Sequence, residues 1–598
     1  MDRPDESRTN DLFEQIPGYL DPPVIPFRYP DASDLLKHLG VKDTNLNRRI
    51  IEFGLTASGF KHFQKTLRND QLESLLRSVN LRLPGPLTPA ISTTAALQDD
   101  PRGLSPYQRA ATLIFGAYSL YHSLRCAELK PIHYQDHPGE IGLYPNLFST
   151  CVIVEGRGPR LFKGVFEPQI TLLIGGRLFL LHLRDLQTEA WVEGLAAAIE
   201  KLAGQVSPLT SNEISPGLLT AADTKTQQHI FSQLAKDPID APILRRLRRS
   251  FITVCLDLEM APSSLEEAAR FAHSTNFTNR WFHSSCQIIV FGNGQACTNM
   301  NYLAHLDGEV MLHCAAEIQQ RAAVYPLRSD AAESAGNGYR IDELDWDIIP
   351  KTIPPKLYQR AQDEIYGLVD QQPATFELPG LGRTFFDKLG INSDAGFVLA
   401  LLATLRKLTG LSPSIIRQIS LSGYRCMDEV SVQVVTDEGL RYLDVLSGME
   451  ESGVHSEQIF NRFQAAEVAH LECLIKAQRQ IPPALLIELF INSRTDRQRI
   501  RAQMALQIIF SSIRISGIDE YHPQPDILIS NLTLYPQAPL VGRPGLRLPT
   551  VKSFGMYYQI WPDRIVTTIT PGIDWKLPNQ VLVKEIEKSI ASYSELKK

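Results

Sequence analysis

The sequence lacks paired cysteines. Eight cysteines are scattered through 598 residues, and none belongs to a C-x-x-C pair. Structural zinc sites and disulfide frameworks use cysteines at recurring short spacings, so neither is indicated. Most of the eight lie inside apolar runs, where a free thiol packs as a small hydrophobic group. We therefore expect a reducing compartment and no bound metal.

Clustered positive charge and long apolar runs are also missing. The formal net charge is -6, and the one dense basic run, residues 245–250, sits in a helical pattern typical of a solvated helix face. Phosphate contacts need clustered lysine and arginine, so no nucleic-acid partner is expected. No apolar run approaches the ~20 residues that cross a bilayer, and neither end carries a secretory or peroxisomal signal. We expect a cytoplasmic protein without a membrane span.

Common catalytic and metal motifs are absent too. The sequence has no G-x-S-x-G elbow and no phosphate-binding P-loop. His133 and His137 stand with Asp136 at a metal-like spacing, but Pro131 and Pro138 bracket them in a loop. A loop does not hold both rings on one face as a helix does, so no metal site is predicted.

What the sequence does contain is a mixture of strands and long helices. With 43% hydrophobic and 21% charged residues, the chain has an ordinary globular composition and the length for two or more domains. Residues 107–129 repeat apolar side chains at helical spacing, and residues 169–183 form two apolar runs joined by two glycines, which predicts a hairpin. An α/β fold is indicated. Residues 370–382, rich in Pro and Gly, are a plausible boundary, and no internal repeat is evident.

Residues 278–318 form the central stretch of the chain. The apolar runs 286–291 and 296–303 flank a Gly-Asn-Gly turn and predict paired strands. Their far end delivers His305 and Asp307 into a loop before a helix. Because the ordinary pKa of imidazole is about 6.5, a histidine there suits general-base chemistry at neutral pH.

These phrases resemble the choline/carnitine acyltransferase family over residues 27–593. The matching residues are N-R-W-F at 279–282, L-F-x-T-C at 147–151, C-L-D at 255–257, L-x-W-x-I at 344–348, and closing strands and a final helix at 554–570 and 577–593. The resemblance implies an α/β fold of two similar chloramphenicol-acetyltransferase-like domains with an active-site tunnel between them. We expect an extended arm at 1–30, an N-terminal domain at 31–372 and a C-terminal domain at 373–598.

The resemblance also implies a histidine base that acts without a covalent enzyme intermediate. The family pattern puts this base on Leu303 when anchored on Asp307 and the glycine after it, and on Tyr302 when anchored on the N-R-W-F opening. Neither is a histidine. Our candidate base is His305, with Asp307 as an orienting or structural carboxylate. An extended chain would point residues 303 and 305 to the same face. The alternative is that His305 is an ordinary loop histidine.

The donor site implied by the resemblance is altered. Arg383, Lys388 and Asp394 are the candidates for contacts to the coenzyme A phosphates, while two positions where the family has lysine hold Asp387 and Gly390. A carboxylate near the 3'-phosphate would repel it. A donor carried on protein-bound phosphopantetheine lacks that phosphate, which makes a carrier-protein donor a natural hypothesis. The alternative is that Arg383 and Lys388 are only surface charges.

The acceptor site is altered as well. The tyrosine and threonine of the family's carnitine pocket align with Ile416 and Glu429, so carnitine is not expected as the acceptor. Glu429 either pairs with a cation or, as we favour, caps a loop. The family's serine-threonine-serine phrase is replaced by residues 546–553, where Thr550 or Ser553 would supply the hydroxyl that stabilises the oxyanion.

The sequence therefore predicts an acyltransferase that moves an acyl group from a thioester to a hydroxyl or amine acceptor. The donor is acyl-CoA or an acyl carrier protein bearing, for example, a polyketide chain. Divergent family members are fused to fungal polyketide synthases or work beside them, so such a synthase is a candidate partner in secondary metabolism. No tightly bound cofactor is expected, and a monomer is predicted. The alternative is an inactive family member that serves as a binding or scaffold protein.

Overall fold

The computed structural model divides the chain into two compact units. The first comprises Met1–Asp21, Asn80–Ala374 and Leu534–Arg547, and the second comprises Pro22–Val79, Thr375–Thr533 and Leu548–Lys598. The predicted limits at 30 and 372 stay predictions. The structure describes residues 16–20, 22, 32, 36, 44–57, 60–61, 92–134, 137–155, 158–183, 191–210, 213–301, 308–327, 339–344, 355–366, 373–410, 414–421, 423–425, 429–452, 456–478, 527–531, 540–542, 554–571 and 575–595.

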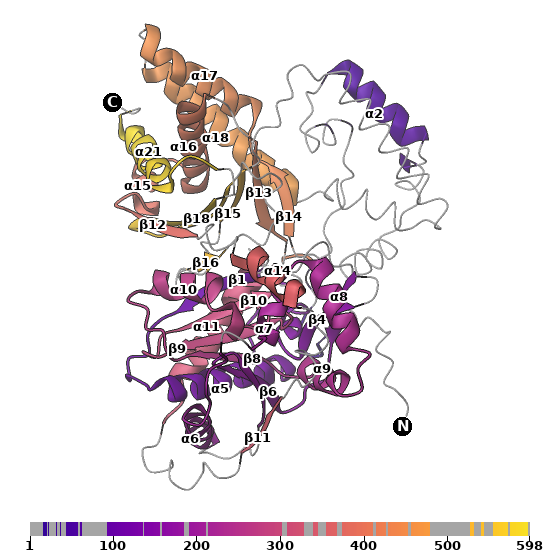
Figure 1. Cartoon of the computed structure of the whole chain (residues 1–598). Helices are drawn as coiled ribbons and strands as arrows, with labels where there is room; N and C mark the ends of the chain where they lie inside the picture. The colour runs from indigo at the N-terminus through magenta and orange to yellow at the C-terminus, as the bar shows by residue number, and fades with distance from the viewer. Residues whose placement is uncertain are drawn as a thin grey trace. The chain divides into compact units, whose positions relative to one another are not determined.

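The first unit is built on an eight-stranded sheet (Figure 1). Its strands, in spatial order, are β11 (Arg340–Glu343), β7 (Arg177–His182), β6 (Gln169–Ile174), β8 (Thr253–Asp257), β9 (Cys286–Phe291), β10 (Ala296–Asn301), β1 (Ser92–Leu97) and β16 (Leu540–Gly542). Strands β6, β8 and β9 run parallel to one another, and the remaining neighbouring strands of this sheet pair antiparallel. Strand β16 pairs with β1 although the predicted boundaries assign its residues to the C-terminal domain.

Helices cover this sheet. They are α5 (Pro106–Arg125), α6 (Trp191–Ala203), α7 (Pro216–Leu219), α8 (Thr224–Leu234), α9 (Asp240–Arg248), α10 (Leu265–Ser274), α11 (Gly308–Val324) and α14 (Pro355–Tyr366), with 3₁₀ turns η2 (Tyr144–Leu147) and η3 (Phe277–Asn279). A separate hairpin joins β4 (Thr150–Glu155) to β5 (Gly158–Lys163), and a two-residue pair joins β2 (His133–Tyr134) to β3 (His137–Pro138). One apolar core lies between the sheet and α8, α9 and α10.

Helices α5 and α11 cross in close contact. Helix α5 begins with a capping box in which Ser105 accepts from the Gln108 amide and Gln108 accepts from the Ser105 amide. Gly116 sits at the crossing, where an added Cβ would lie 2.2 Å from the Ile318 carbonyl oxygen. Only glycine permits so close an approach of the two backbones.

The second unit contains a six-stranded sheet. Its strands, in spatial order, are β12 (Ala374–Pro379), β18 (Arg564–Pro571), β17 (Phe554–Ile560), β15 (Ile527–Asn531), β13 (Ile415–Ser420) and β14 (Glu429–Gln433). The longer helices of this unit are α2 (Asn45–Ala57), α16 (Ser393–Thr409), α17 (Asp437–Ser452), α18 (Ser456–Gln478) and α21 (Asn579–Ala591), preceded in the case of α16 by the short α15 (Arg383–Leu389).

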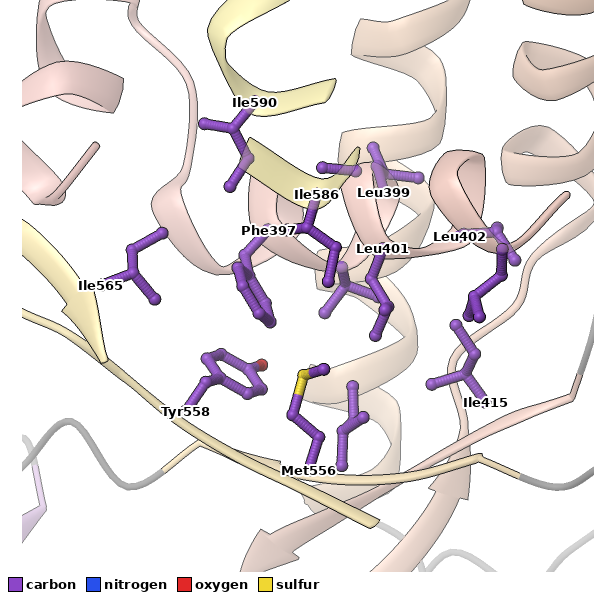
Figure 2. Close-up of a cluster of buried hydrophobic side chains, with 14 of the residues drawn as sticks. Phe397, Leu399, Leu401, Leu402, Ile415, Met556, Tyr558, Ile565, Ile586 and Ile590 are labelled. Carbon is purple, nitrogen blue, oxygen red and sulfur yellow. The ribbon is translucent and has the colours of Figure 1, made fainter. Parts of the chain in front are cut away.

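The core of the second unit lies between α16, α21 and strands β13, β17 and β18, as Figure 2 shows. Helix α16 contributes Phe397, whose ring stacks on Tyr558 of β17 with centroids 4.3 Å apart. Offset stacking of this kind adds to the stabilisation from burial. The sheet and the helix are therefore joined by apolar contacts along most of α16.

The two sheets share one topology. The order β7-β6-β8-β9-β10-β1 in the first matches β14-β13-β15-β17-β18-β12 in the second, with the strands met in the same chain order. Each sheet has three neighbouring parallel strands, β6, β8 and β9 in the first and β13, β15 and β17 in the second. A hairpin partner, β7 or β14, pairs with the first of the three. An antiparallel strand, β10 or β18, pairs with the last of the three. The predicted α/β class with two similar domains is confirmed, whereas the tunnel between them stays a prediction.

The predicted hairpins are present. Gly175 and Gly176 join β6 to β7 with φ of 58° and 82°, and Gly294 has φ 83° in the turn between β9 and β10. Left-handed backbone of this kind favours glycine. Among the described residues, no single helix is long and apolar enough to cross a membrane, although the bent pair α15 and α16 meets that test by length and composition.

Candidate functional site

The residues predicted for acyl transfer fall where the structure gives no description. His305 and Asp307 lie in the segment 302–307, and Thr550 and Ser553 in the segment 543–553, both outside the described residues. The same holds for Leu303 and Tyr302. What the structure does describe is the framework at both ends of 302–307: strand β10, which ends at Asn301, and helix α11, which begins at Gly308.

A buried ion pair forms the base of this framework. Arg280 donates to Asp257 through two hydrogen bonds, at 2.7 Å to Oδ2 and 3.1 Å to Oδ1, and both side chains are 0% exposed. Arg280 also donates to the Ala272 carbonyl at 3.1 Å. Burial alone would lower the pKa of Arg280, but the Asp257 carboxylate outweighs it and raises the pKa. The charged pair is therefore retained in the core.

Two asparagine side chains also donate hydrogen bonds to the Asp257 carboxylate. Asn276 and Asn279 donate to Asp257 Oδ1 at 2.7 and 2.8 Å. Asn276 has left-handed backbone, φ 50°, which asparagine tolerates better than most residues. The Asn279 oxygen accepts from the Gly176 amide at 3.1 Å, so the network reaches the β6–β7 turn. The C-L-D and N-R-W-F phrases, which the sequence analysis quoted separately, meet here.

The cysteines beside this network are not nucleophiles. Burial raises the pKa of Cys255 to about 12, and burial likewise raises the pKa of Cys286 to about 12. A thiol with so high a pKa stays protonated and unreactive at neutral pH. Covalent catalysis by these two side chains is therefore not supported.

A row of buried polar side chains crosses one face of the sheet over β9, β10 and β1. In the strand register, Asn299 of β10 is paired with Gln287 of β9 on one side and with Thr94 of β1 on the other. Directly paired residues on neighbouring strands point to the same face. All three are at most 1% exposed. The side chain of Asn299 finds no hydrogen-bond partner for either amide atom among the described residues. An unsatisfied pair of this kind costs folding free energy and calls for an explanation.

The end of β10 is held in place. The Asn301 side chain donates to the Phe282 carbonyl at 2.8 Å, and its backbone amide donates to the Ser285 carbonyl at 2.9 Å. Ser285 in turn donates its hydroxyl to the Leu147 carbonyl at 2.8 Å. These bonds link β10, the N-R-W-F phrase and η2, so the chain enters residues 302–307 from a fixed point.

His283, which sequence reasoning did not select, lies in the same region. Its Nε2 is 2.8 Å from Gln227 Oε1, and its ring packs against Phe231 with centroids 4.5 Å apart. Burial lowers the pKa of His283 to about 3. The imidazole therefore stays neutral at physiological pH and acts as a hydrogen-bonding core residue rather than a titrating base.

The residues predicted to hold the donor do not share one environment. Arg383, Asp387 and Lys388 are exposed on α15. The Asp394 carboxylate is instead directed into the second unit near the start of α16. There Asn531 and Tyr558 donate to its Oδ1 at 2.6 and 2.8 Å.

The other oxygen of Asp394 is occupied as well. Arg417 of β13 donates to Oδ2, and His470 of α18 lies 3.4 Å from it. Burial alone would raise the pKa of Asp394, but Arg417 and the hydrogen bonds from His470 and Tyr558 hold it well below the usual range. Asp394 is an ionised hub that joins α16 to three strands and α18, a role that motif spacing did not reveal.

The other sequence candidates are placed as follows. Ile416 and Glu429 lie on β13 and β14, where Glu429 pairs in register with Ser420. Of the basic run, Arg246 and Arg248 form ion pairs with Asp342 and Glu155. Among the described residues, no group of three or more His, Cys, Asp or Glu side chains is arranged to hold a metal ion.

Two known proteins are similar in sequence to part of this chain. Carnitine O-acetyltransferase of Saccharomyces cerevisiae mitochondria is 34% identical over 256 residues, which cover 40% of this chain and 37% of that protein. Highly reducing polyketide synthase 17 of Metarhizium anisopliae is 22% identical over 326 residues, 54% of this chain and 10% of the synthase. The chain therefore spans well under two thirds of the length of either relative.

Solved structures of similar shape are more distant. The first condensation domain of the calcium-dependent antibiotic synthetase gives a TM-score of 0.37 at 10% identity, over 88% of this chain and 94% of that one. Trichothecene 15-O-acetyltransferase from Fusarium sporotrichioides gives 0.36 at 9% identity, over 86% and 94%.

The profile of a known protein family matches more than half of the chain. The profile described as choline/carnitine O-acyltransferase matches residues 61–479, and this range includes the Arg280–Asp257 pair and the Asp394 hub. The chain belongs to the choline/carnitine O-acyltransferase family.

Proposed function

We propose that the protein is an acyltransferase that moves an acyl group from a thioester to a hydroxyl or amine acceptor other than carnitine. The observation that carries the proposal is the family match over residues 61–479, which spans the buried framework on both sides of residues 302–307. Family membership supplies the reaction class. The framework supports it because a catalytic loop works best between rigid anchors.

In this proposal His305 is the general base and Asp307 orients it or supports the loop. An extended chain spans at most about 3.6 Å per residue, so the Cα of His305, three residues before Gly308, lies within about 11 Å of the start of α11. That start is fixed by a 17-residue helix packed against α5. The segment that carries His305 is therefore attached at both ends to elements of the first unit, β10 and α11.

The proposed reaction needs no covalent enzyme intermediate. His305 takes the proton of the acceptor hydroxyl or amine while the acceptor attacks the thioester carbonyl. Thr550 or Ser553 donates a hydrogen bond to the oxyanion. When the tetrahedral intermediate collapses, the proton passes from the imidazole to the thiolate that leaves. These roles are assigned from the sequence alone, because His305, Thr550 and Ser553 lie outside the described residues.

The donor proposed is a carrier-protein thioester in preference to free acyl-CoA. Exposed Asp387 lies one residue before exposed Lys388 on α15, so a negative charge accompanies the basic residue proposed to meet a phosphate. Asp394, the third donor-site candidate, already holds four partners within the second unit. Two relatives named as highly reducing polyketide synthases favour a polyketide chain as the acyl group and a synthase as the partner. The proposal includes a cytoplasmic, monomeric protein.

The test is acyl transfer by the purified protein and by His305→Ala. The donors are a short-chain acyl-coenzyme A and an acylated carrier protein, each offered with alcohols and amines, and with carnitine in a separate arm. His133→Ala is the matched control, because His133 is an exposed histidine of the first unit. We expect transfer from the carrier protein, a loss of about 10²-fold or more in His305→Ala, and no change in the control.

Other outcomes separate the alternatives. Transfer that survives His305→Ala would exclude that residue as the base. Preference for acyl-CoA would reject the carrier-protein donor. If no donor supports transfer while carrier protein still binds, the chain is the inactive binding protein that Leu303 and Tyr302, at the usual histidine position, also suggest.

A further inference from the structure

Helix α15 of the second unit begins without a capping side chain. Its N-cap residue is a glycine, so no side chain accepts from the first backbone amides, as serine or aspartate would. The Arg383 amide donates instead to the Trp561 carbonyl at 2.7 Å. The Thr384 amide donates to the Pro562 carbonyl at 3.0 Å. These carbonyls belong to residues 561–563, which join β17 to β18 and which we call the β17–β18 turn. The turn therefore caps α15 from outside the helix.

The N-cap position of α15 must be glycine because the β17–β18 turn lies so close. A Cβ added to Gly382 would lie 2.4 Å from both the Arg564 amide nitrogen and the Trp561 carbonyl oxygen. Both are backbone atoms, which cannot rotate aside as the end of a side chain can. Two residues earlier, the Gly380 amide donates to the Asp563 carbonyl at 2.7 Å. The start of α15 is thus held against the turn by backbone contacts.

The β17–β18 turn is itself held in place. The Trp561 amide donates to the Arg564 carbonyl at 2.8 Å, which closes the turn. The Arg564 guanidinium lies over the Trp561 ring, 4.1 Å from its centroid, and donates to the Asp563 carboxylate at 3.2 Å. A cation over an indole ring is an attractive contact. The turn is therefore a firm support for the helix that it caps.

The other end of α15 is fixed to α16. Gly390 has φ 66°, and its amide donates to the Asp387 carbonyl at 3.0 Å, which ends the helix. Phe386 of α15 is fully buried, and a Cβ added to Gly396 of α16 would lie 2.6 Å from its ring. The start of α16 is in turn tied to the sheet by the Asp394 hub. Because both ends are held, α15 has one fixed place in the second unit.

We propose that Gly382 and the β17–β18 turn position α15 to meet the phosphate of the acyl donor. This inference rests on the proposed function, in which Arg383 and Lys388 contact that phosphate. Both side chains are exposed. The first three amides of α15 already have acceptors in the turn and at Gly382, so a phosphate here is met by side chains and not by the helix N-terminus. Gly382 is a positioning residue, because it sets where those side chains stand.

The position of the phosphate within the donor determines which kinetic constant should change. In acyl-CoA and in an acylated carrier protein alike, the pantetheine arm separates the phosphate from the thioester carbonyl. A displaced α15 loses contact at the phosphate and leaves the reacting carbonyl where it was. Loss of binding that is equal in ground and transition states raises KM and leaves kcat unchanged. A glycine that served folding alone would change stability and neither constant for the donor.

The experiment compares Gly382→Ala with Gly410→Ala, the matched control. Gly410 follows α16 with φ 71°, and no atom lies within 4 Å of an added Cβ, so alanine strains the backbone there without touching α15. Helix α16 has 17 residues, about 25 Å, between that site and α15. Lys388→Gln is a third variant and removes the proposed phosphate contact itself. Turnover, the KM of donor and of acceptor, and thermal unfolding are measured with acylated carrier protein and with acyl-CoA.

We expect Gly382→Ala to raise the donor KM about tenfold, the effect of losing one hydrogen bond to a charged group. Its kcat and acceptor KM should change less than about threefold. Lys388→Gln should raise the donor KM similarly, and the double variant should add little, because a displaced helix has already lost the lysine contact. Gly410→Ala should lower Tm and keep every kinetic constant.

Amide hydrogen exchange of the wild-type protein gives a second readout that needs no folded variant. The Arg383 and Thr384 amides should exchange slowly for a helix N-terminus, because the β17–β18 turn supplies their acceptors. Adding carrier protein that bears phosphopantetheine should slow exchange further across residues 383–389. Rapid exchange of the two amides, or no protection by the carrier protein, would overturn the inference.

The kinetic outcomes separate failure of the inference from failure of the proposed function. An unchanged donor KM in folded Gly382→Ala, with a raised one in Lys388→Gln, shows that the donor meets α15 but that Gly382 does not position it. An equal rise in Gly410→Ala shows a general effect of strain. An unchanged donor KM in Lys388→Gln rejects the proposed donor contact and the inference with it. If wild-type protein transfers from neither donor, the proposed function fails, and protection of residues 383–389 decides whether α15 still meets the carrier protein.

Discussion

Arg280 and Asp257 form an ion pair from which water is fully excluded, with Nη2 of the arginine 2.7 Å from Oδ2 of the aspartate. Arg280 lies in the phrase before β9 and Asp257 ends β8, so the pair links the segments at two neighbouring strands of the first sheet. Asn276 and Asn279 satisfy the same carboxylate oxygen. Breaking such a pair leaves an uncompensated charge in the core.

Asp257→Asn should therefore lower the free energy of unfolding by about 3–5 kcal/mol, because Arg280 keeps its charge but loses its counter-ion. Urea unfolding followed by circular dichroism measures this. Glu213→Gln, which removes a carboxylate from a partly exposed pair with Arg177, is the control and should change stability far less. Equal effects in the two variants would contradict a special role for the buried pair.

Stability should fall in acid through Asp394. Its pKa is depressed in the folded protein, so its contribution is present above the unfolded pKa of about 3.9 and is lost as pH falls through the folded pKa. Asp394→Asn should destabilise the protein near pH 7, and its difference from wild type should shrink below about pH 4. Unfolding measured from pH 7 to pH 3 for both proteins tests this. A difference independent of pH would show that the carboxylate charge is irrelevant.

Gly116→Ala should destabilise the first unit. Its Cβ would meet the Ile318 backbone oxygen at 2.2 Å, and backbone cannot move aside as a flexible side chain can. Overpacking of this kind costs about 1–3 kcal/mol. Gly204→Ala is the control, since its nearest added contacts are at 3.7 Å. Thermal unfolding of both variants measures the effect, and an unchanged Tm for Gly116→Ala would contradict the close crossing of α5 and α11.

Asn299→Leu should raise stability, by about 1 kcal/mol. Neither amide atom of Asn299 has a partner among the described residues, so the side chain bears a desolvation cost that an apolar isostere removes. Asn301→Leu should instead destabilise, because Asn301 donates to the Phe282 carbonyl at 2.8 Å. Chemical unfolding of both variants distinguishes these signs. Loss of stability in Asn299→Leu would indicate a bound water or ligand that satisfies the amide.

Thiol labelling should separate Cys126 from the buried cysteines. Cys126 is exposed, whereas Cys255 and Cys286 are buried with pKa raised by burial to about 12. At pH 8 we expect an electrophilic thiol reagent to modify Cys126 rapidly in native protein, and Cys255 and Cys286 only after unfolding. Peptide mass spectrometry after timed labelling locates the modified residues. Rapid native labelling of Cys255 would contradict the burial of the Arg280 network.

Part of the candidate site was accessible from sequence. The phrases at 255–257 and 279–282 marked the buried framework, whereas His305 and Asp307, which follow β10 in the chain, stay predictions. The role of Asp394 was not accessible, because its four partners come from residues 417, 470, 531 and 558. The contact between the Tyr144 hydroxyl and His313 Nδ1 was not accessible either, because the two residues are 169 positions apart in the sequence.

The sequence by itself determined the family, the α/β class and the hairpins at Gly175-Gly176 and Gly294, because glycine conformation and apolar alternation are local properties. Only the tertiary structure decided that β16 joins the first sheet, that the two sheets share one strand order, and that Arg280 meets Asp257. These are contacts between distant segments, selected by which surfaces pack and which buried charges find partners, and no local pattern encodes them.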